Sequence, residues 1–343
     1  MHKKNTNKTM QDVARLAGVS MMTVSRVLRN EMKVRETTRR KVQAAIKELE
    51  YRPNISARSL ASAKSHLIGF LYQNPSEGYV GQLLIGAMKK AQLRDYSLVL
   101  SNLDGTKTNV SDVLKSLLES SHVDGIILTP PFSDSEEILD MLQAVQLPTV
   151  RISPEQKECP FPFVCMDEAK AAFDMTSYLV DRGHTKIAFI KGHPDHSGSH
   201  LRYDGFMQAL AAHQINLPDH YTPQGMFNYQ SGFEAAEKLM LLADKPTAIF
   251  AANDDMAAAT LSAAQKHHLL VPETISVVGF DDAPIATSIW PRLTTVRQPI
   301  LEMAEMATDL LIDELTGKRD KTKPRQNTMD YQLTIRDTVQ SLN

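Results

Sequence analysis

The sequence predicts an all-α helix-turn-helix head followed by an α/β body of two doubly wound parallel-sheet lobes. The first 64 residues carry fifteen Lys and Arg against five acids, which gives the head +10 and leaves −12 for the rest, within a net charge of −2. The head contains short amphipathic segments around a glycine turn, and the body alternates apolar runs with helical patterns. The 343 residues are enough for two to three domains.

The first helix of the head is predicted from its start and stop signals. Thr9 followed by Asp12 resembles a capping box, and Gly18 ends the helix. Its expected apolar face consists of Val13, Leu16 and Ala17.

The second and third helices complete a helix-turn-helix with a small core. Ser20 caps the second helix, whose apolar positions are Val24, Val27 and Leu28. Residues 36–50 repeat apolar side chains at helical spacing and close a three-helix core. Any small helical bundle shares this periodicity, whereas the positive charge favours a polyanion as partner.

Two adjacent methionines open the second helix, where hydrogen-bonding side chains are expected in a reader of bases. On a helical wheel Met21 lies about 20° from Leu28 and is expected to pack at the rim of the core. Met22 precedes Arg26 by four residues and Arg29 by seven, so it shares their face. We expect Met22 to contact a thymine methyl or a sugar edge through its flexible thioether.

The stretch "YRPNISARSLASAKSH" is too short for a core of its own. Pro53 stops the preceding helix, and Asn54 caps a new one that runs to about Ala61. Leu60 is its one large exposed apolar residue, so the stretch is either a linker with an isolated leucine or a wedge for a minor-groove step.

Two series of strands and helices make up the body. The first contains the runs "LIGFLY", "YSLVLS", "VDGIILT" and "PTVRIS", and the second contains "FVCM", "KIAFIKG", "TAIFAA" and "ISVVGF". Helical patterns separate the runs, so each series predicts a parallel sheet covered on both faces.

Polar residues follow several of these runs, at the sheet edge where open α/β sheets bind ligands. They are Ser153, Asp167, the stretch "HPDHSGSHLR", Asn253 with Asp254, and Asp281 with Asp282. Their hydroxyl, carboxylate, amide and guanidinium groups suit a polyol.

Several of these residues have simpler interpretations. Asn253 and Asp254 are also expected to cap a helix, and Arg202 is also compatible with a surface charge. Asp281 and Asp282 resemble paired catalytic carboxylates, but no Ser-His arrangement, metal motif or Gly-rich phosphate loop accompanies them, so we expect neither an enzyme nor a cofactor.

Three histidines in one stretch suggest a metal, since His193, His196 and His200 fit an H-x-x-H-x-x-x-H pattern. A zinc site needs a rigid frame, and this stretch contains a proline, a glycine and two serines. We therefore expect a flexible polar loop over a cleft, with one histidine touching the ligand, and no metal.

Composition excludes other classes of protein. No apolar run approaches the ~18 residues of a membrane span, and the first residues lack an apolar signal region, so we expect a cytoplasmic protein. Cys159 and Cys165 form neither a C-x-x-C motif nor a disulfide framework.

The segments "MQDVARLAGVSMMTVSRVL", "TRRKVQAAIKELEYRPN" and "SARSLA" resemble the head and hinge of the LacI/GalR family of bacterial transcription regulators. The resemblance continues through "DGIILT", "DRGHTKIAFIKG", "LRYDGFMQAL", "ANDDMAAATL", "ISVVGFDD" and "LTTVRQP", in family order. It implies a ligand-responsive transcription regulator with a body like a periplasmic binding protein, most simply a repressor of carbohydrate-utilisation genes.

The resemblance assigns roles in the head residue by residue. Ser20, Thr23 and Ser25 would touch phosphate, Arg26 would read a guanine edge, and Leu60 would be the wedge of a hinge helix that contains Asn54 and Ala57. The full set of expected DNA contacts is Ser20, Met21, Met22, Thr23, Ser25, Arg26, Arg29, Asn54, Ala57 and Leu60. The expected partner is double-stranded operator DNA with a palindromic sequence.

In the body, the resemblance implies a small-molecule effector, a sugar or sugar derivative. The expected contacts are Ser153, Arg202, Phe227, Asn253 and Asp281, with Phe227 as an aromatic wall. Ser153 departs from the pattern, because sugar-binding relatives often carry Asp there. If the strand is regular, Arg151 points to the same face as Ser153, and the cleft then accepts an acidic or phosphorylated sugar.

The same resemblance sets the expected organisation. We expect a DNA-binding domain at 1–52, a hinge helix and linker at 53–65, and an effector-binding and dimerisation core at 66–343. Within the core, the N-lobe is about 66–165 and 299–326, and the C-lobe about 166–298 and 327–343. The end of the chain has no heptad repeat, so we expect a homodimer.

Three alternatives stay open. They are a corepressor-dependent regulator with a nucleoside or sugar-phosphate effector, a sugar-binding transport protein, and an enzyme such as a sugar isomerase or kinase. The basic head and the lack of a signal segment argue against the transport protein, and turnover by the purified protein would favour the enzyme.

Overall fold

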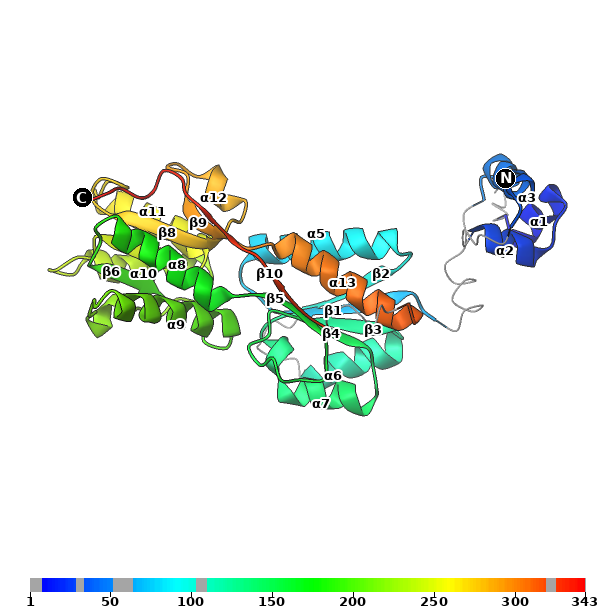
Figure 1. The fold of residues 1–343 in the computed structure, drawn as a ribbon, viewed down its shortest axis with the longest axis horizontal. Helices are drawn as coiled ribbons and strands as arrows, with labels where there is room; N and C mark the ends of the chain where they lie inside the picture. The colour runs from blue at the N-terminus through cyan, green and yellow to red at the C-terminus, as the bar shows by residue number, and fades with distance from the viewer. Residues whose placement is uncertain (1–7, 29–33, 52–63, 103–109, 319–324, 343) are drawn as a thin grey trace, which may run out of the picture. The chain divides into compact units, whose positions relative to one another are not determined.

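The computed structural model describes residues 8–28, 34–51, 64–102, 110–318 and 325–342. The chain divides into two compact units, Met1–Ser65 and His66–Asn343, called here the head and the body (Figure 1). Four of the expected DNA contacts, Arg29, Asn54, Ala57 and Leu60, lie outside the described residues.

The described part of the head forms α1 (Met10–Ala17), α2 (Met21–Leu28) and α3 (Glu36–Glu48). The capping box is confirmed: the Thr9 N–H donates to the Asp12 carboxylate at 2.9 Å, and the Asp12 N–H donates to the Thr9 hydroxyl at 3.3 Å. Gly18 ends α1 with φ +66°, a left-handed conformation that glycine adopts at little cost.

The core of the head is a cluster of small apolar side chains from these helices. Its buried members are Val13, Ala14, Val24, Val27, Val42, Ala45 and Tyr51. The expectation for Leu16 is wrong, because its side chain is exposed. The buried side of α1 is centred between Val13 and Ala14. With about 100° per residue, Leu16 points about 110° away from that centre, so its side chain faces away from the core.

The first sheet of the body is fully parallel and belongs to the N-lobe, in the order β10-β5-β4-β3-β1-β2. Its strands are β1 (Leu67–Tyr72), β2 (Ser97–Asn102), β3 (Gly125–Leu128), β4 (Thr149–Ile152), β5 (Phe163–Met166) and β10 (Gln326–Met329). Its main helices are α5 (Glu77–Leu93), α6 (Val110–Lys115), α7 (Glu136–Ala144) and α13 (Ile300–Thr316). Helices α5 and α13 cover one face, and α6 and α7 cover the other (Figure 1).

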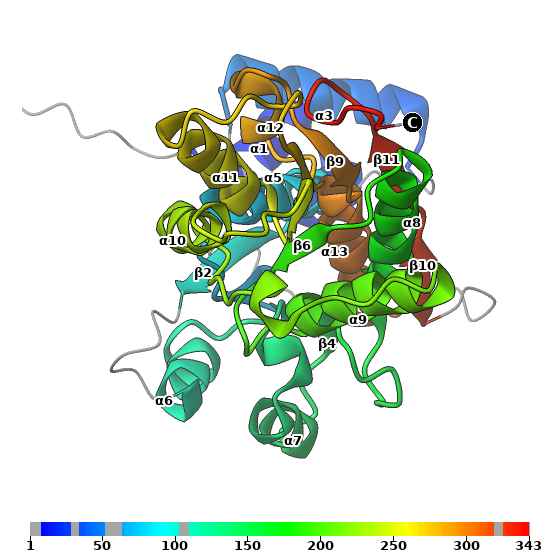
Figure 2. The same ribbon diagram turned by 90° about the vertical axis from the view of Figure 1, so that its left-hand side faces the viewer.

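The second sheet belongs to the C-lobe and has the order β11-β9-β8-β7-β6, with only β11 antiparallel. Its strands are β6 (Ile187–Ile190), β7 (Ala248–Ala251), β8 (Ser276–Asp281), β9 (Thr294–Arg297) and β11 (Gln332–Thr334). Its main helices are α8 (Glu168–Asp181), α9 (Ser197–Ala212), α10 (Tyr229–Met240) and α11 (Asp254–Lys266). Figure 2 shows α8 and α9 on one side of β6, and α10 and α11 on the other.

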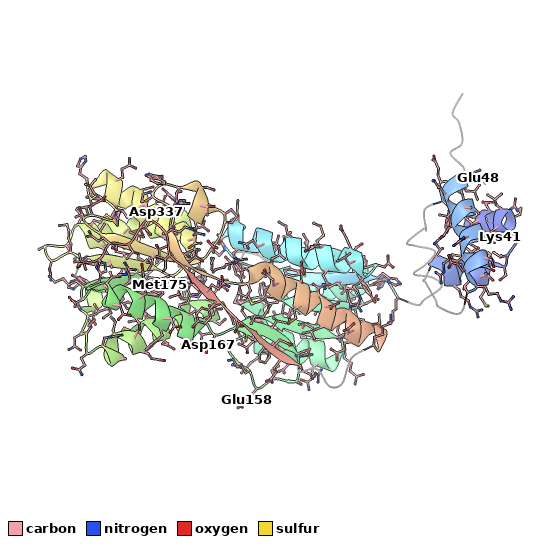
Figure 3. All side chains as sticks on the ribbon, turned by 45° about the horizontal axis from the view of Figure 1, so that its top comes forward. Lys41, Glu48, Glu158, Asp167, Met175 and Asp337 are labelled. Atoms are coloured by element: carbon pink, nitrogen blue, oxygen red, sulfur yellow. The ribbon has the colours of Figure 1, made fainter. Side chains whose placement is uncertain are left out.

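Short helical turns complete the described body: η1 (Ser116–Ser120), η2 (Phe132–Asp134), η3 (Asp219–Tyr221) and α12 (Ile285–Ser288). The central strands are buried along their length, as continuous apolar runs predict. The labelled Met175 of α8 lies in the C-lobe core (Figure 3). No helix among the described residues is long and apolar enough to cross a bilayer.

The chain crosses between the lobes three times, after β5, after β9 and after β10. The run "FVCM", expected to open the second series, is β5 of the N-lobe, since it pairs with β4 and β10. The later N-lobe segment continues to Met329 rather than 326, because all four residues of β10 pair with β5. Between these, the chain passes from β9 to α13 through Gln298 and Pro299.

Candidate functional site

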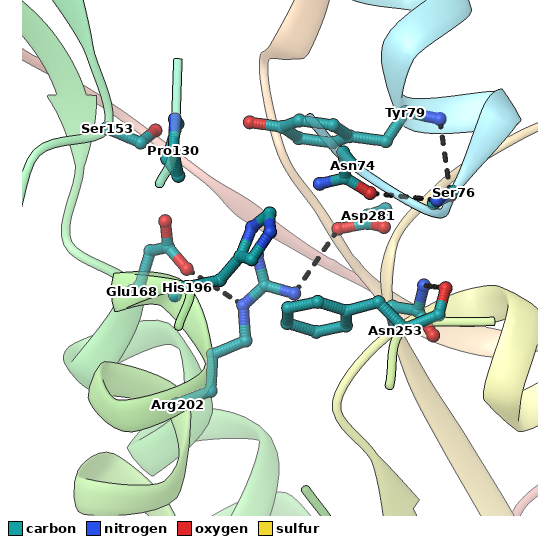
Figure 4. A pocket seen from close by; sticks show the side chains of 12 residues that line it. Asn74, Ser76, Tyr79, Pro130, Ser153, Glu168, His196, Arg202, Asn253 and Asp281 are labelled. Atoms are coloured by element: carbon teal, nitrogen blue, oxygen red, sulfur yellow. Dashed lines mark hydrogen bonds and ion pairs between the residues drawn. The ribbon is translucent and has the colours of Figure 1, made fainter. Parts of the chain in front are cut away.

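A pocket lined by residues of both lobes lies between the two lobes of the body (Figure 4). Its lining residues are Asn74, Ser76, Tyr79, Pro130, Ser153, Glu168, His196, Gly198, Arg202, Phe227, Asn253 and Asp281. Half of them stand within two residues of the carboxyl end of a strand, the edge where open α/β sheets bind ligands. All five residues expected to contact the effector line this one pocket.

Three of these five residues have a backbone conformation that side chains other than glycine rarely adopt. The φ angles are +46° at Ser153, +57° at Phe227 and +124° at Asp281. Such conformations cost about 1–3 kcal/mol each and persist where the surrounding structure holds them. The turns that aim these side chains into the pocket are therefore strained.

Arg202 is the central cation of the pocket and is 6% exposed. Its Nε donates to Glu168 Oε2 at 2.8 Å, its Nη1 donates to the Ala252 carbonyl at 2.6 Å, and its Nη1 lies 3.6 Å from Asp281 Oδ1. Burial disfavours the guanidinium charge, but Glu168 and Asp281 outweigh it and raise the pKa of Arg202. The interpretation of Arg202 as a surface charge is wrong.

Glu168 begins α8 and is 5% exposed, and the sequence analysis named its neighbour Asp167 instead. Its neighbour Asp167 caps the same helix by accepting the Lys170 N–H at 2.9 Å, and Asp167 does not line the pocket. Gly198 makes room for the Glu168 carboxylate, because a Cβ there would lie 2.7 Å from Oε2.

Asp281 accepts a hydrogen bond from the Gln298 amide at 2.6 Å. Burial raises the pKa of Asp281 to about 7, although Arg202 and Gln298 act in the opposite direction. Behind it, Asp254 accepts from the Thr295 hydroxyl at 2.6 Å and the Ala283 N–H at 2.8 Å. Burial and the charge of Asp281 raise the pKa of Asp254.

The resemblance of Asp281 and Asp282 to a catalytic pair has no geometric support. Asp281 faces Arg202 and Gln298 in the pocket, while Asp282 accepts from Arg336 at 2.6 Å and does not line the pocket.

Asn253 is the cap of α11, as one of its two interpretations predicted. Its side-chain oxygen accepts the Met256 N–H at 3.0 Å, and its Nδ2 donates to the Phe227 carbonyl at 3.0 Å. Asn253 therefore also holds the strained backbone of Phe227 in place.

His196 and Phe227 form an aromatic corner of the pocket. Their ring centroids are 5.7 Å apart at an interplanar angle of 77°, an edge-to-face contact. Burial, His193 and Arg202 lower the pKa of His196 to about 3, so its imidazole is neutral at physiological pH.

The expected flexible loop is wrong in part, because α9 begins at Ser197 and takes in His200. The ring of His200 bonds the Pro194 carbonyl at 2.5 Å rather than joining its neighbours. Among the described residues, no group of three His, Cys, Asp or Glu side chains is placed to hold a metal ion.

The N-lobe supplies lining residues that the sequence reasoning missed, Asn74, Ser76 and Tyr79. The Ser76 N–H donates to the Asn74 side-chain oxygen at 2.8 Å, and the Ser76 hydroxyl caps α5 by accepting from the Tyr79 N–H at 3.4 Å. Figure 4 shows the Tyr79 and Ser153 hydroxyls facing one another. Burial raises the pKa of Tyr79, so its hydroxyl stays protonated.

The expectation that Arg151 faces the pocket is wrong. Strand β4 ends at Ile152, so the left-handed Ser153 does not continue its alternation. Arg151 is fully buried in the N-lobe, where its Nη1 donates to the Ser133 carbonyl at 3.1 Å and its guanidinium lies 5.7 Å from the Phe163 ring centroid. Burial lowers the pKa of Arg151, and the pocket gains no cation from it.

In the head, the expected DNA contacts that the structure describes lie on one helix and its cap. The Ser20 hydroxyl accepts the Thr23 N–H at 3.2 Å, which confirms the cap of α2. Arg26 is exposed, and Met22 is 63% exposed. The described face of α2 is therefore accessible to a polyanion.

The expectation that Met21 packs at the rim of the core is wrong, because it is 52% exposed and outside the apolar cluster. Val24 and Val27 are buried, while Leu28 is only partly so. Met21 lies about 90° from the centre of the arc that Val24 and Val27 define. Both methionines therefore belong to the open surface of α2.

A basic helix-turn-helix head followed by a two-lobed α/β body with an interlobe pocket defines a DNA-binding regulator with an effector-binding domain. The comparisons agree. Residues 9–54 match the family model "Bacterial regulatory proteins, lacI family", and residues 176–339 match "Periplasmic binding protein-like domain". The chain belongs to the lacI family of bacterial transcription regulators.

Relatives that align with most of the chain support this assignment. The ribose operon repressor of Escherichia coli (strain K12) is 38% identical over 311 residues, which cover 90% of this chain and 93% of the relative. Catabolite control protein A of Priestia megaterium is 36% identical, covering 89% of this chain and 92% of the relative. The lac repressor dimer bound to operator and the anti-inducer ONPF superposes with a TM-score of 0.79 at 28% identity, covering 97% and 99% of the two chains.

Proposed function

We propose that this protein is a dimeric repressor of carbohydrate-utilisation genes, and that a small sugar-like effector bound between its lobes changes its affinity for a palindromic operator. The observation that carries the proposal is the pocket itself. Five residues chosen from sequence, Ser153, Arg202, Phe227, Asn253 and Asp281, line one cavity together with an aromatic corner. Paired hydrogen-bonding groups beside an aromatic face suit a polyhydroxylated ring.

Operator binding is assigned to the face of α2. Arg26 reads a guanine edge, Ser20, Thr23 and Ser25 contact phosphate, and Met21 and Met22 lie against the groove surface. Arg29, Asn54, Ala57 and the Leu60 wedge complete this proposed set from outside the described residues. A two-fold dimer fits two half-sites about one helical turn apart.

Relatives support the effector class and the assembly. One relative is named a ribose operon repressor, and a solved neighbour at 28% identity is titled a transcriptional regulator CelR-cellobiose complex. A further neighbour is titled a lac repressor dimer bound to operator. We propose the same mode of action here, in the cytoplasm where the chromosome lies, by binding rather than by turnover.

Two experiments on the purified full-length chain test the proposal, one for operator binding and one for effector binding. Fluorescence anisotropy with a palindrome from its own promoter region is expected to give salt-dependent, sequence-preferring binding that an effector changes. A thermal-shift screen of neutral sugars and their phosphates is expected to find a stabilising ligand, because an effector at 100 times its Kd adds about 2.7 kcal/mol. Chemical turnover of a sugar, or equal affinity for all DNA sequences, contradicts the proposal.

A further inference from the structure

The pocket contains an acid that the assignment of effector contacts did not include, the buried Glu168 at the start of α8. On the N-lobe wall of the pocket, Ser153 offers a buried hydroxyl. Across the same cavity, Glu168 supplies a carboxylate from the C-lobe. Figure 4 shows one of its oxygens directed at Arg202 and the other turned toward the side of Ser153 and Pro130.

No uncompensated positive charge is present among the described residues that line this space. Arg202 is the cation among the lining residues, and Glu168 at 2.8 Å and Asp281 at 3.6 Å already compensate it. The neighbouring His196 is neutral, because burial lowers its pKa to about 3. Arg151, which was expected to add a second positive charge, is absent from the lining.

A phosphate or carboxylate placed beside Glu168 would therefore meet a like charge in a desolvated site, which is costly. A hydroxyl, by contrast, can donate to the outward oxygen of Glu168 in a charge-assisted hydrogen bond. The Nη2 of Arg202 makes no hydrogen bond to the described residues. It can therefore donate to a ring or hydroxyl oxygen of the ligand.

We infer that Glu168 restricts the effector to uncharged polyhydroxylated molecules, because its carboxylate accepts a hydrogen bond from a ligand hydroxyl and repels an anion placed beside it. The inference rests on the proposed function of the pocket. It names the class of effector as a neutral sugar or polyol, and it excludes the sugar phosphates and sugar acids that the sequence alone left open.

The test compares matched neutral and anionic ligands in titration calorimetry with the full chain. The pairs are each aldopentose with its 5-phosphate, and each aldohexose with its 6-phosphate and its uronate. The wild type is expected to bind at least one neutral member and to bind the anionic partner at least 100-fold more weakly. In Glu168→Gln, the neutral-to-anionic affinity ratio is expected to fall 10-fold or more, because Arg202 loses its closest counter-charge.

Two further variants separate selectivity from structure. Glu168→Asp keeps the charge and is expected to keep the exclusion of anions, even where the neutral ligand binds more weakly. Glu136→Gln makes the same change at the exposed first residue of α7 and is expected to leave the ratio unchanged.

The inference is overturned if Glu168→Gln weakens the binding of the neutral and the anionic ligand equally. It is also overturned if the wild type prefers the anionic ligand. In both cases the pocket is still an effector site. A wild type that binds no member of any pair overturns the proposed sugar effector and, with it, this inference. The two failures are thus distinguishable.

Discussion

The face of α2 and the interlobe pocket are both surfaces for recognition, but they are built in opposite ways. On α2, Met21, Met22 and Arg26 lie exposed above a core of valines to which they contribute little. In the pocket, the buried Arg202 forms ion pairs with two buried carboxylates, Glu168 and Asp281. Changes on α2 should therefore alter recognition alone, whereas changes in the pocket should alter recognition and stability together.

The largest expected effect is that of Arg202→Met. Removing the guanidinium leaves Glu168 and Asp281 buried without their counter-charge, which costs about 3–5 kcal/mol in comparable sites. Urea denaturation followed by circular dichroism measures the loss, and the effector response should disappear with it. As a control, Arg292→Ala removes a solvent-exposed ion pair with Asp337 and should change the urea midpoint little.

Asp281→Asn tests the electrostatics of the pocket through pH. The folded pKa of Asp281 is about 7, above its ordinary value of 3.8, so the folded state holds a proton that the unfolded state has released. The free energy of unfolding of the wild type therefore falls as pH rises from about 4 to about 7, and Asp281→Asn should remove that part of the slope. The variant should equal the wild type near pH 3, gain on it as the pH rises, and exceed it most above pH 7.

The matched control for this pH series is Asp337→Asn. Its hydrogen bond to Arg292 lowers the pKa of Asp337, so its contribution to stability is present above the unfolded pKa and is lost on acidification. It should give no gain at pH 8. A gain of the same size in both variants would show that the effect is not specific to the pocket.

Arg26→Ala tests the other side of the comparison. Losing a bidentate guanine contact should cost about 1–3 kcal/mol of binding and relax preference at one symmetric pair of operator positions. Because the side chain is exposed, the urea midpoint should change little. Anisotropy with a set of base-substituted operators measures it. Arg15→Ala, which removes an exposed charge of α1, is the control, and an Arg26 variant with intact sequence preference would refute the assignment.

The smallest expected effects are those of the two methionines. Met21→Ala should cost less than about 0.5 kcal/mol of head stability, because the side chain is largely exposed, whereas Val24→Ala should cost about 1–3 kcal/mol. Met22→Gln should shift base preference at one pair of operator positions. An unchanged binding profile would mean that Met22 contacts no base.

Much of the fold was predictable because it depends on local signals. The run "LIGFLY" is β1, and the capping box at Thr9 and Asp12 begins α1 as expected. The errors came from tertiary contacts: the run "FVCM" reads as the start of a new series, and only its pairing with β10, more than 150 residues later, places it in the N-lobe. No spacing pattern carries that information.

Part of the pocket lining was also predictable from local signals, and the rest depends on tertiary contacts. Asn253 and Asp281 follow strands and were found by that rule, which, applied to β1, would also have found Asn74 and Ser76. Glu168 follows β5 by two residues, so the same rule pointed to this turn but selected the neighbouring Asp167. What distinguishes Glu168 is its bond to Arg202, 34 residues away in sequence. The expectation for Arg151 failed for a different reason. It assumed regular strand alternation between Arg151 and Ser153, and the left-handed conformation of Ser153 breaks that alternation.

The three crossings between the lobes have a consequence for engineering this molecule. The head is one continuous segment that ends at Ser65, so a chimera can exchange its operator preference at a single junction. Neither lobe is continuous, and transplanting one requires three simultaneous junctions, after Met166, near Gln298 and after Met329. New regulatory circuits are therefore easier to assemble by swapping heads between intact bodies than by recombining lobes.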